Sequence, residues 1–388
     1  SEREMGMSDE HDGIIDLPED TPIGTPFAEI MGLDDPVVDI NVTPNKQDCL
    51  GVRGIARDLA AAGLGTLKPL DATPIDGSYD SPIKVELNLG IGYEAACSCF
   101  LGRHFRGLKN GPSPKWLQQR LTAIGLRPIS ALVDMTNYIT YDLGRPLHVF
   151  DAGKVTGNIQ ARMAVPGETF LALDGKEYQL DGEITVIADQ NAAESIGGVM
   201  GGEASGCTDE TTEMFLEAAL FDAHRTAATG RRLGIESDAR YRFERGVDPA
   251  MVQPGVEVAT RMVLEICGGE TSHTVMAGTP EGPAKVVGFR PARVTELIGI
   301  DVDEAEQRKI LSDLGFGISG EGDIWQVTAP TWRTDIDGEA DIVEEVARIA
   351  GYDRITSTPL PRISVTSKPA LTPAQRRRPT AKRALAVR

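Results

Sequence analysis

Two side chains in this sequence of 388 residues stand in settings that suit chemistry on a polar ligand. The first, His148, lies between a Gly-Arg-Pro turn and an aspartate in the segment 143–151 (LGRPLHVFD). No cysteine is close to it and no second ligand stands at metal spacing, so it has the character of a polar pocket residue rather than a metal ligand. A lone histidine beside a turn is also common as a satisfied surface or core group.

The second, Glu217, stands inside the apolar stretch 214–221 (MFLEAALF). A carboxylate in such a stretch must find a partner or shift its pKa, and groups with shifted pKa values gather at functional sites. A structural pair inside the core would meet the same requirement. The sequence therefore leaves both ligand binding and structural pairing open for Glu217.

Three further positions are candidates for the same polar pocket. Gly201 belongs to 197–206 (GGVMGGEASG), where it could be a turn glycine and nothing more, because this run needs a positive φ somewhere. Ser237 and Ala239 open the segment 237–249 (SDARYRFERGVDP), and the serine hydroxyl can donate or accept a hydrogen bond. We see no Ser/His/Asp order that would indicate a covalent route.

A second constellation is acidic and lies on the helix expected over 338–350. Its carboxylates are Asp335, Asp341, Glu344 and Glu345. The last three share one side of the helix at spacings of three and four residues, and Asp335 precedes the helix. Such carboxylates repel one another unless a cation or arginines intervene. Arg348 projects into the same face as a counter-ion, so spacing alone favours a solvated acidic face over a metal site.

Composition and charge exclude several classes of protein. The chain is 41% hydrophobic and 25% charged, as in ordinary globular proteins, and its length predicts two to four domains. No apolar run reaches the roughly 18 residues of a membrane helix, which predicts a cytoplasmic protein without a membrane partner. The five cysteines form neither a zinc pattern nor an obvious disulfide set.

The formal net charge of −19 opposes non-specific binding to nucleic acid, whose attraction to proteins is mostly electrostatic. RNA would therefore need local basic patches. The segments 103–109 (RHFRGLK) and 225–245 are candidates. Solvated arginines on a helix would explain each of them equally well.

The longest block, 83–276, predicts an α+β domain with a largely antiparallel sheet. Short strands such as 157–164 alternate with turns, and Asp174-Gly175 is a hairpin signal. Three helices begin near Ser113, Asp222 and Asp248, where a capping residue or a proline stands at the helix start.

Smaller units flank this block, so the expected fold class is α+β multidomain. The order helix, helix, hairpin, helix over 284–358 predicts a winged-helix-like module. Residues 36–82 predict a similar small module, with a strand over 37–42, a helix over 49–63 and a linker. In that helix Leu50, Ile55 and Leu59 are expected to face inward. Residues 1–35 are expected to be a lead-in and 359–388 the start of a further domain. We expect the chain to be an internal piece of a longer polypeptide.

In sequence order, several of these segments resemble the bacterial phenylalanine–tRNA ligase beta subunit. They are 41–54 (NVTPNKQDCLGVRG), 133–138 (VDMTNY), 143–151, 197–206, 216–220 (LEAAL), 237–249 and 329–352. The resemblance covers nearly all of the chain. It implies a structural lead-in derived from an upstream tRNA-binding domain, an editing domain over 83–276 and a winged-helix-like module.

In that family the middle domain hydrolyses tyrosine wrongly attached to phenylalanine tRNA. The resemblance implies that His148 lines the pocket near the ester, that Gly201 and the Ser237 hydroxyl place substrate and water, and that Ala239 lines the substrate side. It also implies that Glu217 accepts a hydrogen bond from the tyrosine hydroxyl. The family pattern has threonine where this chain has Ser237, so the hydroxyl is kept and the methyl group is lost. A carboxylate can select tyrosine over phenylalanine, because an apolar pocket alone discriminates poorly between two ligands that differ by one hydroxyl.

The resemblance further implies partners and cofactors. The four carboxylates of the acidic face match positions that bind Mg2+ at the junction with the alpha subunit. ATP is used by the full complex, a heterotetramer that acts on tRNA(Phe) with tyrosine or phenylalanine, and aminoacylation needs the alpha subunit. A non-catalytic scaffold that binds the alpha subunit and RNA is the alternative; it would be expected to lose His148 or Glu217, and both are present. Five scattered histidines argue against a metal-dependent hydrolase.

Overall fold

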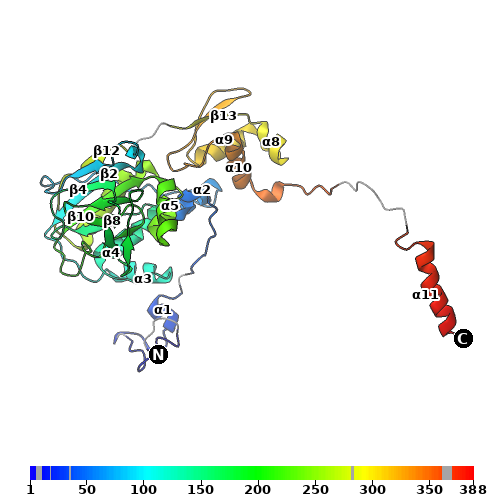
Figure 1. Cartoon of the computed structure of the whole chain (residues 1–388), viewed down its shortest axis with the longest axis horizontal. Coiled ribbons are helices and arrows are strands. Elements are labelled where there is room, and N and C mark those ends of the chain that lie inside the picture. Colours follow the sequence, from blue (N-terminus) through cyan, green and yellow to red (C-terminus); the bar gives the residue numbers. More distant parts are fainter. Residues whose placement is uncertain (6–10, 18, 35, 281–283, 361–368) are drawn as a thin grey trace.

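The computed structural model describes residues 1–5, 11–17, 19–34, 36–280, 284–360 and 369–388. Figure 1 shows a large β-rich body, drawn from cyan to green, and a smaller body formed by residues 286–354. The predicted α+β class is confirmed. Short helices precede or interrupt these bodies, namely α1 (Phe27–Met31) and η2 (Glu94–Ala96), and α11 (Pro373–Ala386) lies apart from both.

The apolar stretch around Glu217 becomes β10 (Glu213–Phe221), a central strand whose residues are buried from Met214 onward. On one side it pairs with β2 (Cys97–Arg106), and on the other with β3 (His148–Asp151); both pairings are antiparallel. The short strands β11 (Glu270–Thr271) and β12 (Val275–Gly278) pair with the far edge of β2. Because β10 is covered on both faces, its sequence is continuously apolar instead of alternating.

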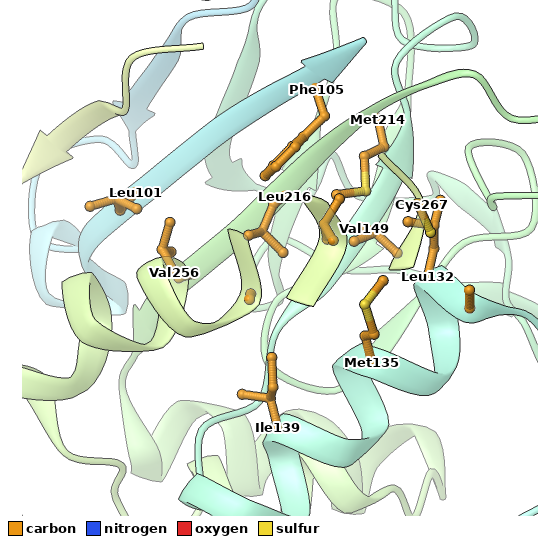
Figure 2. Packing of buried hydrophobic residues seen from close by; sticks show 14 of the residues in the cluster. Leu101, Phe105, Leu132, Met135, Ile139, Val149, Met214, Leu216, Val256 and Cys267 are labelled. Atoms are coloured by element: carbon orange, nitrogen blue, oxygen red, sulfur yellow. The ribbon is translucent and has the colours of Figure 1, made fainter. Parts of the chain in front are cut away.

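Helices cover one face of this sheet. They are α3 (Lys115–Ala123), α4 (Ala131–Leu143) and α7 (Val252–Ile266). Figure 2 shows Met135 and Ile139 of α4 and Val256 of α7 directed toward Leu216 and its neighbours on the sheet. This layer is the main hydrophobic core of the large body.

A second sheet covers the opposite face. It contains β1 (Val85–Asn88), β4 (Ile159–Met163), β7 (Thr185–Ala188), β8 (Ala193–Ile196) and β9 (Met200–Gly201), in that order. Within this sheet, as far as the chain is described, only β1 and β4 pair in parallel. The hairpin of β5 (Thr169–Leu171) and β6 (Glu177–Gln179) is a separate pair with Asp174-Gly175 between its strands, as predicted. Phe150 and Phe215 of the first sheet pack against Ile187 of the second. The two sheets and the helical layer make a three-layer body.

Three helical segments follow β10 and close the end of the two sheets. They are α5 (Ala223–Leu233), α6 (Asp238–Phe243) and the 3-10 turn η3 (Pro249–Met251) before α7. Asp222 and Ser237 cap α5 and α6 by accepting from backbone amides of the first turn. These caps fix where each helix begins.

The smaller body confirms the predicted helix, helix, hairpin, helix order and adds a strand before it. Its elements are β13 (Val286–Phe289), α8 (Arg293–Ile298), α9 (Glu304–Asp313), β14 (Gly317–Ser319), β15 (Trp325–Thr328), α10 (Glu339–Ala350) and η4 (Tyr352–Arg354). The strands form one antiparallel sheet with β15 in the middle. Trp325 and Phe289 are fully buried at its centre.

The first small module differs from the prediction. Residues 37–42 form no strand and are largely exposed, because no other strand of the described chain pairs with them. The expected helix divides into η1 (Gln47–Leu50) and α2 (Val52–Ala61), and Leu59 is 48% exposed, not inward. Ala61 instead packs in the core of the smaller body. Helix α2 therefore joins that body although almost 230 residues separate the two in the chain.

The basic segment 103–109 is not a surface patch. Arg103 is 1% exposed and donates from Nη1 to Glu257 Oε2 at 3.0 Å and from Nε to the Ser272 carbonyl at 2.9 Å. Arg106 is exposed and pairs with Glu270. Within the second segment, 225–245, Arg231 is the one exposed arginine without a recorded acceptor among the described residues. The basic residues of both segments mainly serve the fold.

Removing Arg103 should therefore destabilise the large body. Arg103→Met leaves the Glu257 carboxylate buried without its partner, which costs about 3–5 kcal/mol. Urea unfolding should show this loss. The double variant with Glu257→Met should recover part of it, while Arg106→Met at the exposed pair should cost at most about 1 kcal/mol. An Arg103→Met variant as stable as the parent would show that the pair is dispensable.

Candidate functional site

A small pocket lies where β3 and β10 of the first sheet meet β8, β9 and helix α6. Its polar and small lining residues include His148, Ser195, Gly201, Glu217 and Ala239. Its apolar walls include Leu147, Ile196, Met200, Phe221 and Phe243. The cavity measures about 60 Å³, less than half of the roughly 150 Å³ cavity that holds benzene in a protein core. An aromatic ligand would enter only if the wall moves.

The pairing of β3 with β10 places His148 beside Glu217. The two residues stand directly opposite each other in the antiparallel register, so their side chains leave the sheet on the same face. The His148 ring packs edge-on against Phe150, with ring centroids 4.5 Å apart. A shift of one residue in this register would put the two side chains on opposite faces of the sheet.

Glu217 is buried and His148 is half-buried, and one polar atom of each side chain has no protein partner. Glu217 Oε2 and His148 Nε2 lack solvent contact and a hydrogen-bond partner. Burial raises the pKa of Glu217 to about 8, against a weaker lowering by the Arg145 charge, and burial lowers the pKa of His148 to about 4. At neutral pH the histidine is uncharged and the carboxyl is mainly protonated. The pocket thus offers two unsatisfied hydrogen-bonding atoms and little net charge.

A glycine is required at position 201 because the His148 ring lies close to its backbone, and not because the chain turns there. It lies in β9 opposite Ser195, while Gly198 takes the positive φ of 69° in the preceding turn. A Cβ atom on Gly201 would stand 2.3 Å from His148 Cε1 and 2.8 Å from Nε2. Any side chain at 201 would displace the imidazole or fill the pocket.

Ser237 stands behind the pocket while Ala239 lines it. The Ser237 hydroxyl donates to the Val199 carbonyl at 2.5 Å and accepts from the Arg240 amide at 3.1 Å. It therefore fastens the start of α6 to the loop that precedes Gly201. The structure brings four of the five predicted pocket residues together around one cavity and gives the Ser237 hydroxyl a structural task.

Two features of the pocket were not predicted from the sequence: Arg145 and the aromatic wall. Arg145 is 1% exposed and is not in an ion pair with any described residue. Phe221 and Phe243 pack edge-on with centroids 5.2 Å apart and close the pocket. The Gly-Arg-Pro turn before His148 gave no sign of this burial, because a charged residue in a turn is ordinarily exposed.

The four acidic residues around α10 are not gathered at one point. Glu345 is fully buried and lies 2.5 Å from Arg333, 2.7 Å from Arg348 and 3.4 Å from Lys46. Asp335 pairs with Arg333 at 2.7 Å. Asp341 accepts the backbone amides of residues 337 and 338 at the helix start, and Glu344 accepts from the Asn45 side-chain amide. Arg348 is the counter-ion that the sequence predicted.

In this arrangement the four carboxylates do not fit a magnesium ion. Among the described residues, three acidic or thiol ligand atoms lie within 4.8 Å of one another only at Asp48, Cys49 and Asp58. There the Lys46 ammonium lies 3.4 Å from Asp48 and 3.7 Å from Asp58, so a protein cation already neutralises the group. Opposite charges around Glu345 hold its pKa down at about 2 despite burial.

Comparisons with known proteins identify the class. Residues 96–268 match the family model described as the B3/4 domain, and residues 287–352 match the tRNA synthetase B5 domain. The two matched segments fall on the large body and on the smaller body. The chain thus has the domain content of a tRNA synthetase subunit.

The particular family follows from the relatives. The chain is 55% identical over 386 residues to the phenylalanine–tRNA ligase beta subunit of Paramagnetospirillum magneticum, and 56% and 54% identical over 388 residues to those of Mesorhizobium japonicum and Brucella abortus. Each alignment covers all of this chain and 48% of the relative. The chain belongs to the phenylalanine–tRNA ligase beta subunit family and spans about half the length of the curated relatives it matches.

A solved structure is similar at a lower level. It is an N-terminal fragment of the phenylalanyl-tRNA synthetase beta subunit from Pyrococcus horikoshii, at 16% identity and a TM-score of 0.41, covering 81% of this chain and 89% of that one. That likeness is too weak to place any residue. Among the described residues, no helix combines the length and the apolar character that crossing a membrane requires.

The raised pKa of Glu217 has a consequence for stability. Between the ordinary carboxyl pKa of 4.5 and about 8 the folded state binds more protons than the unfolded state, so stability falls as pH rises, by at most about 1.4 kcal/mol per pH unit. Glu217→Gln should therefore gain stability over the parent across this window, and the gain should level off above about pH 8. Thermal unfolding against pH measures it. Glu177→Gln, at an exposed carboxyl, is the control. If the parent and Glu217→Gln gave parallel profiles of stability against pH, the raised pKa of Glu217 would be contradicted.

Because of the ion-pair network around Glu345, we expect chelators to have no effect on the thermal stability of this chain. Because Arg333, Arg348 and Lys46 already neutralise the carboxylate, EDTA should leave the melting temperature of this chain unchanged. Glu345→Gln should destabilise it by about 3–5 kcal/mol, because three cations lose a buried partner. The exposed Glu344→Gln is the control. A melting temperature that falls on chelation would show that a metal ion, not the network, holds the junction.

Proposed function

We propose that this chain carries the post-transfer editing site of phenylalanine–tRNA ligase, which hydrolyses tyrosine from mischarged tyrosyl-tRNA(Phe). One observation carries the proposal: Glu217 Oε2 and His148 Nε2 are both buried without partners in one cavity. Unpaired buried polar atoms are costly, and a ligand that presents a hydroxyl at one end and a scissile ester at the other would satisfy both.

Glu217 distinguishes tyrosine from phenylalanine. The phenolic hydroxyl donates to the free oxygen of Glu217, while a phenylalanine ring leaves that oxygen unpaired at a cost of about 1–3 kcal/mol. Sites that hydrogen-bond a substrate hydroxyl reject the analogue without it far more strongly than apolar pockets do. The surrounding apolar wall of Phe221 and Phe243 supplies the contact for the ring.

His148 assists water. Its pKa of about 4 keeps the imidazole neutral, so Nε2 can accept a proton from a water that attacks the ester carbonyl. The bond between that carbonyl carbon and the ribose oxygen breaks, the proton passes to the ribose oxygen, and the products are tyrosine and tRNA with a free hydroxyl. The imidazole is thus unprotonated near neutral pH, as a general base must be, and its low pKa makes it a weak base. The Ser237 hydroxyl is held by Val199 and positions α6 instead of attacking the ester.

The same proposal assigns the partners. The full subunit docks the alpha subunit, which supplies aminoacylation with ATP, and both act on tRNA(Phe) in the cytoplasm as a heterotetramer. Binding of Mg2+ by Asp335, Asp341, Glu344 and Glu345 is confined to that complex, because this chain by itself directs Arg333 and Lys46 into the site. The non-catalytic scaffold remains the alternative outcome of the experiments below.

Hydrolysis of tyrosyl-tRNA(Phe) and phenylalanyl-tRNA(Phe), by this chain and by the reconstituted complex, tests the role of Glu217. Above about pH 8, where Glu217 is ionised, Glu217→Ala should slow hydrolysis of the tyrosyl ester by about 10- to 150-fold, equivalent to about 1.5–3 kcal/mol for a hydrogen bond to a charged group. Phenylalanyl ester hydrolysis should change far less. Glu194→Gln, a buried carboxyl of β8 outside the pocket lining, is the matched control. Equal losses for both esters would exclude the proposed selection.

His148→Ala should lower the hydrolysis rate of the bound ester without changing the preference for tyrosine, by about 10²–10⁴-fold for loss of a general base. Chelators should have no effect on this rate. His104→Ala removes a buried histidine of β2 that does not line the pocket, so it should keep the activity if it folds. A parent protein that binds both esters and hydrolyses neither would favour the scaffold.

A further inference from the structure

Arg145 is a buried charge next to the pocket that the proposed mechanism has not used. Its Nη2 donates to the Ala219 carbonyl at 2.5 Å, and its Nε and Nη1 have no hydrogen-bond partner. The guanidinium carbon lies 5.9 Å from the ring centre of Phe243, which forms part of the pocket wall. Cations are rarely buried unless they are paired, so this one calls for a physical explanation.

The position of Arg145 relates it to Glu217. Ala219 is two residues beyond Glu217 on β10, so the hydrogen bond fixes the guanidinium alongside the strand that carries the carboxyl. Arg145 is also the one charged group that opposes the effect of burial on Glu217. Helix α7 leaves room for this arrangement at Gly255, whose Cβ would lie 3.2 Å from Arg145 Cγ. The chain therefore places a fixed positive charge behind the pocket carboxyl.

The other titratable groups around the pair are few. Cys97 and Cys99 of β2 face it, and burial raises the pKa of both thiols, so they stay neutral. His148 of β3 is neutral above about pH 4. Asp248, at the start of η3, also acts on Arg145 and accepts from the Ala250 amide. Among the residues that the structure describes, Asp248 is thus the one other carboxylate that acts on Arg145.

We propose that Arg145 is a positioning residue for substrate selection: its positive charge stabilises the ionised form of Glu217 and so sets the pH above which the pocket prefers tyrosine to phenylalanine. This inference rests on the proposed editing function. The ionised carboxylate accepts a stronger hydrogen bond from a phenol than the neutral acid does. It is also penalised more when phenylalanine leaves it unpaired. Arg145 therefore acts through Glu217 and does not touch the ester.

Two substitutions separate charge from hydrogen bonding. Arg145→Gln can still donate to the Ala219 carbonyl but lacks the charge, and Arg145→Lys keeps the charge. The ratio of tyrosyl to phenylalanyl ester hydrolysis by the full complex is measured between about pH 6 and pH 9. For Arg145→Gln we expect the rise of this ratio to move by about one pH unit upward from the Glu217 pKa of about 8, with about a fivefold lower ratio at pH 8. Arg145→Lys should stay close to the parent.

Further variants decide between explanations. Arg145→Gln should add nothing to the altered selectivity of Glu217→Gln, because it acts through that carboxyl. Asp248→Asn should leave the pH profile in place; a profile that moves with Asp248→Asn would overturn the inference. So would an Arg145→Gln variant that slows both esters equally without moving the profile, because that is the result of a structural role. If the parent complex hydrolyses neither ester, the proposed function fails, and the inference fails with it.

Discussion

The structure depends on one strand that is covered on both faces. Helices pack on one side of β10 and a second sheet on the other, so nearly every residue of the strand must be apolar. Glu217 is the exception, and the alternation of side chains along the strand directs it to the sheet side, beside His148. The cavity, the shifted pKa values and the aromatic wall all follow from that register, because a slip of one residue would exchange the two faces.

Sequence patterns predicted the elements with local signals. The hairpin at Asp174-Gly175 and the helices that follow Asp222 and Asp248 have turn or capping residues that act within a few positions. The strand expected over 37–42 does not form. An alternating pattern of apolar and polar residues only favours a strand, which also needs a neighbouring strand to pair with. Helix α4 was not predicted, since its segment mixes polar and apolar residues, and its burial is set by α7 and the sheet. Arg103 looked like a surface residue because its buried partner, Glu257, lies 154 positions away.

The candidate site likewise has some features with a local sequence signal and others that depend on contacts between distant segments. Glu217 could be singled out from its apolar neighbours alone, and the family pattern indicated His148, Gly201 and Ala239. The closeness of Gly201 to the imidazole, the engagement of the Ser237 hydroxyl by Val199 and the burial of Arg145 could not be predicted, because each depends on the packing of separate segments. The acidic residues near α10 share a helix face as expected, yet basic residues from other segments, Arg333 and Lys46, decide what Glu345 contacts.

The contacts between residues 45–58 and α10 affect the order in which the chain can fold during its synthesis. Lys46 and Asn45 bind carboxylates 299 positions further along the chain, and Asp58 binds Arg348 across 290 positions. At a synthesis rate of about 5–20 residues per second, roughly 15–60 s separate the emergence of the two halves from the ribosome. During that interval Asn45, Lys46 and Asp58 lack these partners while the large β-rich body is synthesised between them. The smaller body can therefore close only after the large body has been synthesised, and residues 45–58 reach these contacts only when their far partners are made.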